Sequence, residues 1–394
     1  MNQIFKILDD NFYYSQRIRR SIHMYPELSN VEFNTSTFIE SILLENGVSD
    51  IIRLGDTSLL ALFKSTIETK DTIIFRADMD AILLQEENNN DYVSKNAGVM
   101  HACGHDVHCA TLLSLVPIFK KCNFTKNIGL LFQQGEESVI SGAKKIIKLI
   151  PFDLIINEIY GFHVWSEIKL GEVIIKKGVL MGSVDGISIK LIFKDTGIDP
   201  LIITSKFIQE IRNIIPNDKI EENTKVSLTL GEIKGGIAPN KFIPEVIING
   251  TIRSICNKEK DKLITNINKI KSIMEYGYNM SIEVNYTPNI RPILKNNEEC
   301  VSQLNCACSQ VEELSVIDMN FITNCSEDFG FYLQHYNGAY ILIGSRSSKD
   351  TAYPLHDSKF NVDEKVILYG AKIFVQLLLD KKILYYKQNF CVPL

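Results

Sequence analysis

The chain has 394 residues and a net charge of −5, with 45% hydrophobic and 23% charged residues. This length predicts two domains, and the acidic balance argues against a nucleic-acid-binding protein, which usually carries a basic face. Nine scattered cysteines, no signal peptide and no apolar run near the ~18 residues of a membrane span indicate a cytoplasmic protein with reduced thiols.

Helices and strands are predicted to alternate along the first half of the chain. Apolar spacing predicts a helix over residues 1–20, and Pro26 predicts a loop over 21–27. Further helices are expected at 35–45, 109–120 and 143–149, and strands at 50–54, 59–63, 72–75, 128–132 and 158–163. Such alternation is typical of an α/β domain, whose sites lie at the carboxyl ends of its strands.

A different pattern occupies residues 185–290. Strands are expected at 187–193, 226–233, 246–252 and 281–286, and helices at 199–215 and 258–276. This β-α-β-β-α-β order is the ferredoxin-like signature. We therefore expect an inserted domain at 185–290, between the two parts, 1–184 and 291–394, of a discontinuous catalytic domain.

Residues 100–108 hold the densest group of potential metal ligands. Three of the seven histidines lie in these nine residues together with Cys103. Thiolate and imidazole groups this close can converge on one transition-metal ion. Because Cys103 and His105 are two residues apart, a loop or extended segment would bring both to one ion. His108 could be another ligand, or could support His105 from behind.

Three further candidate ligands are expected at strand ends or in loops. They are Glu137, His163 and His356. One thiolate, three imidazoles and one carboxylate suit Zn, and also Mn, Co or Ni. Five ligands exceed one tetrahedral shell, so the sequence predicts two divalent metal ions that share a ligand. Glu136, beside Glu137, could then act as general base on a metal-activated water and return the proton to a leaving nitrogen.

Each of these residues taken alone is more often structural than functional. A single histidine on a strand is usually a buried core residue, and adjacent glutamates usually lie on a solvated surface. The prediction of a site therefore depends on the combination.

Taken together, these segments resemble metal-dependent amidohydrolases related to aminoacylase and carboxypeptidase G. Within that family they are similar to the branch of hippurate hydrolases, auxin-conjugate hydrolases and N-acetyldiaminopimelate deacetylases. The shared motifs follow one order along nearly the whole chain. They are I-H-x-x-P-E-L at 22–28, R-A-D-M-D-A at 76–81, M-H-A-C-G-H-D at 100–106, F-Q and E-E within 132–137, G-F-H-V-W at 161–165, G-T-I-R at 250–253, E-D-F at 327–329, and L-H at 355–356 followed by Phe360.

The resemblance implies an α/β fold of two domains. One is a di-metal, phosphorylase/hydrolase-like catalytic domain, and the other is an inserted ferredoxin-like α+β lid that often forms a homodimer. The resemblance also implies the five ligands and the base named above. By the same mapping, Asp80 lies behind a metal ligand with Asp78 as a second candidate nearby, and Asn240 and Arg253 of the lid face the substrate.

One motif of the branch is missing from the lid. Relatives in the branch carry G-H-A-A-x-P-H after the first lid strand, and the resemblance implies that this His steadies the oxyanion in a neighbouring active site. Here the segment at 194–200 reads K-D-T-G-I-D-P, and no histidine occurs between His163 and His335. Loss of one oxyanion donor commonly costs about 10²–10³ in rate. The lid-mediated homodimer is in doubt for the same reason.

The sequence leaves more than one function open. We expect metal-dependent hydrolysis of the amide bond of N-acyl amino acids or related small amides, with Asn240, Lys194 or Thr196 as substitute oxyanion donors. The alternative is a catalytically weakened or specialised homologue that binds metal or ligand. An amide-forming enzyme of a biosynthetic pathway is a third option.

Overall fold

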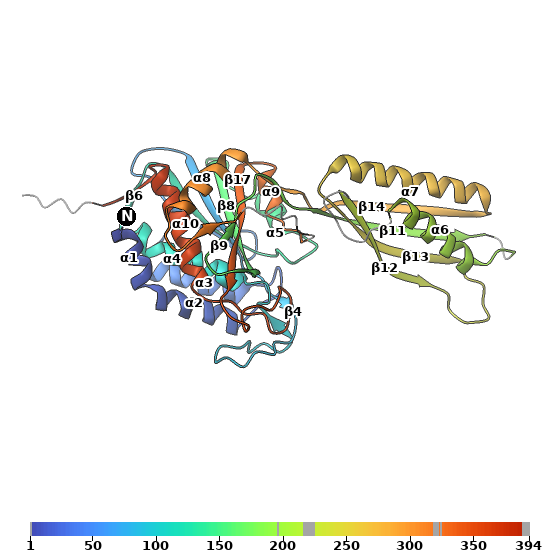
Figure 1. Cartoon of the computed structure of the whole chain (residues 1–394), viewed down its shortest axis with the longest axis horizontal. Coiled ribbons are helices and arrows are strands. Elements are labelled where there is room, and N and C mark those ends of the chain that lie inside the picture. Colours follow the sequence, from blue (N-terminus) through green and yellow to red (C-terminus); the bar gives the residue numbers. More distant parts are fainter. Residues whose placement is uncertain (1, 195–196, 216–224, 318–322, 324, 388–394) are drawn as a thin grey trace, which may run out of the picture. The chain divides into compact units, whose positions relative to one another are not determined.

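The computed structural model describes all residues except 1, 195–196, 216–224, 318–322, 324 and 388–394 (Figure 1). The chain divides into two compact units. The first consists of Met1–Gly178, Lys295–Asn320 and Phe331–Leu394, and the second of Val179–Leu294 and Phe321–Gly330. The sequence predicts different limits for the inserted domain, 185–290, and those limits stay a prediction.

The first unit is built on one mixed sheet of eight strands. In spatial order they are β1 (Ile51–Leu54), β2 (Ser58–Phe63), β7 (Asn127–Gln133), β3 (Asp71–Asp78), β8 (Ile155–Lys169), β17 (Asn337–Arg346), β9 (Glu172–Ile174) and β16 (Ser315–Val316). The central strands β7, β3, β8 and β17 pair in parallel. Parallel strands are covered on both faces, which explains why β7 is buried along its whole length.

The remaining elements of the first unit are helices and short ribbons. The helices are α1 (Asn2–Asp10), α2 (Phe12–Met24), α3 (Phe33–Glu45), α4 (His105–Phe119), α5 (Gly142–Ile146), α8 (Glu298–Ser309), α9 (Gly330–Leu333) and α10 (Val366–Asp380). The first residue of α9, Gly330, is assigned to the second unit. The ribbons pair β4 (Ile82–Leu83) with β5 (Val99–Met100), and β6 (Cys122–Phe124) with β18 (Leu384–Tyr386). A third pair of strands consists of β10 (Gly178–Met181) and β15 (Leu294–Asn296).

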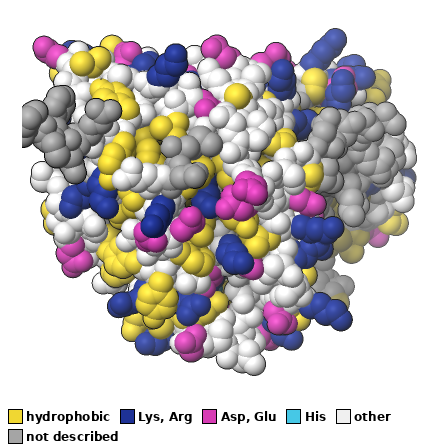
Figure 2. Space-filling view, turned by 60° about the vertical axis from the view of Figure 1, so that its left-hand side comes forward, with side chains coloured by type: hydrophobic (Ala, Val, Ile, Leu, Met, Phe, Trp, Pro, Cys, Tyr) yellow, Lys and Arg dark blue, Asp and Glu magenta, His cyan; other side chains and the backbone are white. Residues whose placement is uncertain are grey.

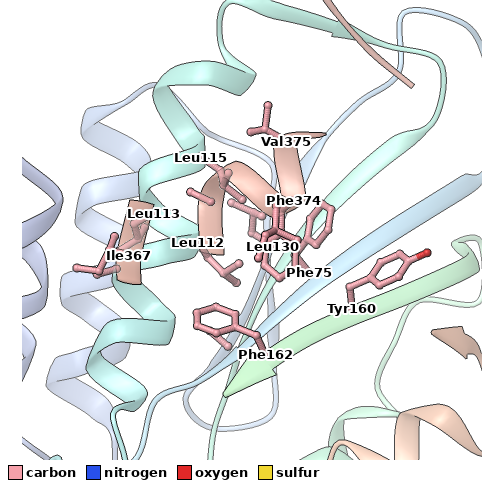
Figure 3. Close-up of a cluster of buried hydrophobic side chains, with 14 of the residues drawn as sticks. Phe75, Leu112, Leu113, Leu115, Leu130, Tyr160, Phe162, Ile367, Phe374 and Val375 are labelled. Carbon is pink, nitrogen blue, oxygen red and sulfur yellow. The ribbon is translucent and has the colours of Figure 1, made fainter. Parts of the chain in front are cut away.

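An aromatic core joins the sheet to α4 and α10 (Figure 3). The ring of Phe374 on α10 lies 4.4 Å from the ring centroid of Phe75 on β3 and 5.9 Å from that of Phe162 on β8. The full burial of one such phenylalanine side chain stabilises the folded state by about 1.5–3 kcal/mol. This packing fixes β3, β8 and α4, the elements that carry or adjoin several candidate site residues.

Several elements of the first unit are longer than predicted, among them β3, β8, α4 and α2. β8 continues past His163, which therefore lies within a strand and not at its end, because β17 pairs with the extra residues. α4 begins at His105 and not at 109, after Gly104 in the left-handed conformation. The single helix expected over 1–20 is two helices, α1 and α2. α2 continues to Met24, where a loop was expected, because the proline at position 26 restricts only its immediate predecessor, Tyr25.

The second unit is a four-stranded antiparallel sheet with two helices and its own apolar core. Its elements are β11 (Ser183–Phe193), α6 (Pro200–Ile214), β12 (Val226–Gly235), β13 (Glu245–Ser254), α7 (Asn257–Gly277) and β14 (Met280–Arg291). The strand order β12-β13-β11-β14 confirms the predicted ferredoxin-like fold. Asp199 caps α6, since its side chain accepts from the backbone N–H groups of Leu201 and Ile202.

The face of the molecule in Figure 2 carries charges of both signs. On the face in Figure 2, basic and acidic side chains are interspersed among hydrophobic ones, so this face carries no broad field of one sign. Within the described part of the chain, no helix combines the length and apolar character needed to cross a membrane.

Candidate metal centre

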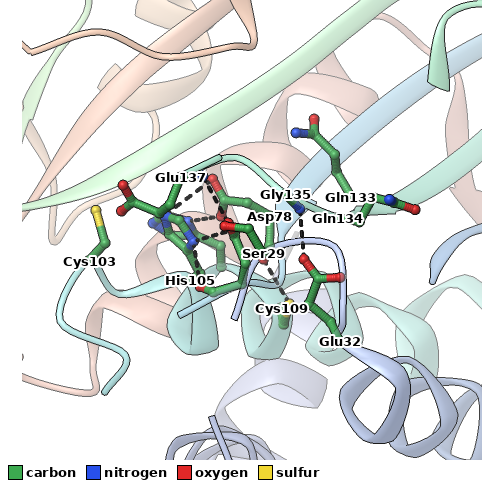
Figure 4. A network of polar contacts seen from close by, with 12 residues as sticks. Ser29, Glu32, Asp78, Cys103, His105, Cys109, Gln133, Gln134, Gly135 and Glu137 are labelled. Carbon is green, nitrogen blue, oxygen red and sulfur yellow. Dashed lines mark hydrogen bonds and ion pairs between the residues drawn. The ribbon is translucent and has the colours of Figure 1, made fainter. Parts of the chain in front are cut away.

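Side chains predicted as metal ligands lie together in the first unit. Cys103 Sγ is 3.3 Å from His163 Nε2 and 3.3 Å from His356 Nε2, and His356 Nε2 is 3.0 Å from Glu137 Oε1. His105 contributes an atom within 4.8 Å of those of Cys103 and His163. Figure 4 shows Cys103, His105 and Glu137 side by side. The structure thus brings all five candidates together, although four different segments of the chain supply them.

Local backbone geometry explains how Cys103 and His105 come to share a site. Gly104 between them has φ of +85°, which favours glycine. A Cβ at this position would lie 2.4 Å from Val164 Cγ2. The tight turn therefore requires a residue without a side chain. It places His105 at the first position of α4 and leaves Cys103 in the preceding loop.

The hydrogen bonds of His105 leave one of its ring nitrogens available to a metal. His105 Nδ1 donates to the Asp80 carbonyl oxygen at 2.8 Å and lies 3.2 Å from Asp80 Oδ1. His105 Nε2 is buried and has no hydrogen-bond partner among the described residues. A buried nitrogen without a partner is costly, and its lone pair suits a cation. This observation shows that the residues present fit a metal ion.

The protonation states of His163 and Glu137 also fit a cation. Burial lowers the pKa of His163 to about 3, so this ring is in the neutral form that binds metals. His163 Nδ1 donates to the Val164 carbonyl at 2.7 Å, which turns Nε2 towards Cys103. Burial opposes charge on Glu137, but the hydrogen bond with His356 and the His105 ring nearby lower its pKa to about 2. Burial raises the pKa of Cys103, so only a bound cation would keep it as a thiolate.

Asp80 lies behind the candidate ligands and orients two of them. Its Oδ2 accepts from the backbone N–H of Glu137 at 2.8 Å and from Ser29 Oγ at 2.6 Å. Together with its contacts to His105, these bonds tie the helix start to the turn after β7. Both carboxylate oxygens of Asp80 have partners, so Asp80 acts on the site through His105 and Glu137.

His108 is excluded as a metal ligand by its hydrogen bonds. Its Nδ1 lies 2.6 Å from Asp78 Oδ1 and its Nε2 accepts from the backbone N–H of Val164 at 3.1 Å, so both ring nitrogens are occupied. Burial opposes charge on Asp78, but Arg76 and the neighbouring histidines lower its pKa. His108 and Asp78 therefore form a supporting pair beside His105, whose Nε2 is 3.6 Å from Asp78 Oδ2.

Glu136 is buried beside the ligands. It is only 6% exposed, and it offers a carboxylate oxygen within 4.8 Å of ligand atoms of His105 and Glu137. Adjacent residues of one turn thus present two carboxylates to the same site. This arrangement suits a division of labour in which one carboxylate binds metal and the other transfers protons.

Sequence reasoning missed the side chains that hold this turn in place. Glu32 and Ser29, from the loop before α3, contact Gly135 and Asp80 respectively. A glutamate just before a helix usually interacts with solvent, so no local pattern signalled its burial. Only the nearby I-H-x-x-P-E-L motif indicated that this loop belongs to the site.

The residues predicted on the lid belong to the second unit. Asn240 lies in the exposed loop between β12 and β13, and Arg253 lies in β13 opposite Ser227. Lys194 is exposed at the end of β11, and Thr196 lies outside the described residues. The roles of Asn240 and Arg253 towards a substrate stay a prediction.

Comparison with known proteins gives a consistent result. The profile of peptidase family M20/M25/M40 matches residues 74–380. An N-acetyl-L-cysteine deacetylase of Bacillus subtilis (strain 168) is 31% identical over 360 residues, covering 89% of this chain and 84% of that protein. An N-acetyldiaminopimelate deacetylase of Listeria monocytogenes serovar 1/2a is 28% identical over 376 residues, covering 92% and 98%.

A solved structure supports the fold. A Bacillus subtilis protein described as a dinuclear metal-binding peptidase superposes with a TM-score of 0.82, covering 95% of this chain and 99% of that one. The sequences are 23% identical. At this identity the likeness shows the fold alone.

Proposed function

The chain belongs to peptidase family M20/M25/M40, and on that premise we propose that it hydrolyses the amide bond of N-acyl amino acids. Its relatives include deacetylases and carboxypeptidases, which are hydrolases. The observation that carries the proposal is the convergence of five potential ligands, with the buried carboxylate of Glu136 close to two of them, His105 and Glu137. The names of two relatives favour a small acyl group such as acetyl.

In the proposed site, each side chain has a distinct task. The side chains that would hold two divalent ions (Zn, Mn, Co or Ni) are Cys103, His105, Glu137, His163 and His356. When bound, such ions polarise a carbonyl and lower the pKa of water. Glu136 removes a proton from the attacking water and delivers it to the leaving nitrogen. By accepting from Nδ1, the Asp80 carbonyl oxygen keeps Nε2 of His105 turned towards the site.

Replacement of Glu136 by alanine tests this division of labour. Glu136→Ala should lower kcat on N-acetyl amino acids by about 10³-fold or more, because proton transfer by a positioned side chain contributes about 10²–10⁴. Metal content, measured by elemental analysis, should not change, because Glu136 is not among the ligands. Substantial turnover by Glu136→Ala across a panel of N-acyl amino acids would show that the mechanism is wrong.

A second candidate function rests on the sequence of the lid. No histidine occurs between His163 and His335, so this lid supplies no imidazole to an oxyanion. A homologue that binds metal but has lost efficient catalysis, or that serves one narrow biosynthetic substrate, would show this pattern. Bound metal without turnover on any N-acyl amino acid would favour this second function.

A further inference from the structure

The turn after β7 carries both the proposed base and a proposed ligand. It runs through Gly135, which has φ of +60°, to Glu136 and Glu137. A Cβ at Gly135 would lie 2.8 Å from the side chain of Asn30. Because the turn leaves the sheet, its backbone N–H groups need partners from elsewhere. The group that binds these donors also sets the position of the two glutamates.

Glu32 supplies that partner from a distant part of the chain. Its side chain is fully buried. Glu32 Oε1 accepts from the backbone N–H of Gly135 at 2.7 Å and from that of Asn30 at 2.8 Å, and Oε2 accepts from Thr57 Oγ1 at 2.8 Å. Figure 4 shows the bond between Glu32 and Gly135. Hydrogen bonds to a carboxylate are shorter and stronger than those between neutral groups.

Neighbouring residues of the same loop reinforce this contact. Gln134 Nε2 donates to Asn30 Oδ1 at 2.9 Å, and Ser29 Oγ donates to Asp80 Oδ2 at 2.6 Å. The loop before α3 thus binds the turn on one side and the residue that orients His105 on the other.

We propose that Glu32 is a positioning residue, whose hydrogen bond to Gly135 holds the turn so that Glu136 reaches the reacting atoms and Glu137 reaches the metal. This inference rests on the proposed function. Glu32 itself touches neither substrate nor metal.

A comparison of Glu32→Ala with Glu32→Gln separates the effect of the hydrogen bonds of Glu32 from the effect of its charge. Glu32→Ala leaves the N–H groups of Gly135 and Asn30 without their acceptor. In Glu32→Gln, the amide oxygen can still accept from both N–H groups, and the amide nitrogen can donate to Thr57, because a hydroxyl also accepts. The glutamine variant should therefore keep the turn in place.

Kinetics and cobalt binding provide two independent measurements. Glu32→Ala should lower kcat on N-acetyl amino acids by about 10–100-fold with a smaller change in KM, and should weaken Co²⁺ binding by about 10-fold, as the loss of partners behind a metal ligand does. Co²⁺ binding is followed by the visible absorption of the bound ion. Glu32→Gln should stay within about 3-fold of the wild type in both measurements.

Glu27 offers a matched control in the same loop. Its carboxylate also accepts from two backbone N–H groups and a hydroxyl: Asn34 N at 3.1 Å, Thr35 N at 2.7 Å and Thr35 Oγ1 at 2.9 Å. It accepts in addition from Asn34 Nδ2 at 2.7 Å. These donors begin α3 and do not belong to the turn. Glu27→Ala should lower the melting temperature but leave kcat and Co²⁺ affinity within about 3-fold of the wild type.

The outcomes decide the proposal in either direction. It is overturned if Glu32→Ala keeps wild-type kcat and Co²⁺ affinity, if Glu27→Ala loses them equally, or if Glu32→Gln falls as far as Glu32→Ala. Should Glu32→Ala not fold, Thr57→Val removes one hydrogen bond of Glu32 and should lower kcat by about 3–10-fold; unchanged kcat would overturn the proposal. If the wild type hydrolyses no N-acyl amino acid, the proposed function fails, while the Co²⁺ comparison still tests Glu32.

Discussion

His23 is a buried histidine that faces a carboxylate with each ring nitrogen. Its Nδ1 is 2.8 Å from Asp106 Oδ2, and its Nε2 is 3.2 Å from Glu86 Oε1. A nitrogen donates to a carboxylate only when it carries a proton, so this pair of carboxylates favours the imidazolium form of the ring. Burial and Arg19 oppose this charge, but Asp106 and Glu86 outweigh them and raise the pKa of His23. Since Asp106 follows His105 in α4, this pair anchors the start of the helix at the site.

The raised pKa of His23 predicts a pH dependence of stability. The ordinary pKa of histidine is about 6.5. A group whose pKa is raised by folding stabilises the protein fully below its unfolded value and loses that contribution as the pH rises through the folded value. The difference in free energy of unfolding between the wild type and His23→Gln should therefore be larger at pH 6 than at pH 9. Urea unfolding at both pH values measures it, and a difference that grows towards pH 9 would contradict the assignment.

Single residues also show why part of the site was predictable. Cys103, His105 and Glu137 belong to residue types that bind metals, and their motifs mark them in the sequence. Glu32 and Thr57 have no such mark, because their importance comes from a partner about a hundred residues away or from each other. Hydrogen bonds between distant segments do not leave a local pattern.

At the scale of elements, the start of α4 is the most constrained part of the site. Gly104 combines a positive φ with a contact that leaves no room for Cβ. Gly104→Ala should therefore destabilise the first unit by more than the roughly 1–2 kcal/mol of backbone strain alone. It should also weaken metal binding, because Cys103 and His105 adjoin it. Urea unfolding and Co²⁺ titration measure the two effects.

Gly98 provides the control for Gly104. Its φ is +74°, yet a Cβ there would meet nothing within 4 Å. Gly98→Ala should thus show the strain without the clash, and should leave Co²⁺ affinity unchanged. Equal losses of stability in the two alanine variants would mean that the contact with Val164 does not constrain the turn.

The main strands and helices of the two units could be read from the sequence, but α8 and the short strands were not predicted, and several element ends differ from those expected. Buried strands and amphipathic helices leave periodic apolar patterns, which is why the ferredoxin-like unit was predicted correctly. The end of β8 depends on β17, which lies far along the chain and pairs beyond His163. The start of α4 depends on a left-handed glycine that the sequence does not distinguish from other glycines.

The whole molecule consists of two units with separate cores, and only the first contains the candidate metal centre. Calorimetry should therefore show two transitions. Ligands that bind only the folded state stabilise it by about 2.7 kcal/mol at a hundredfold excess over Kd, so removal of metal with a chelator should lower one transition by several degrees. The other should not move. A chelator that shifts both transitions equally, or neither, would contradict this assignment.

Self-association is a second property of the whole molecule. The resemblance implies a homodimer through the lid, and the edge strands of the second unit, β12 and β14, are the natural places for such pairing. The homodimer stays a prediction, which sedimentation at micromolar concentration would check.

The central claim is that this chain hydrolyses N-acyl amino acids with two divalent metal ions. The most direct test titrates the metal-free protein with Co²⁺ while following the release of free amino acid from N-acetyl amino acids. The account predicts turnover that saturates at two equivalents per chain, and uptake of the same two equivalents without turnover by Glu136→Ala. Two bound equivalents with no release from any substrate of the panel, or full turnover without metal, would contradict the claim.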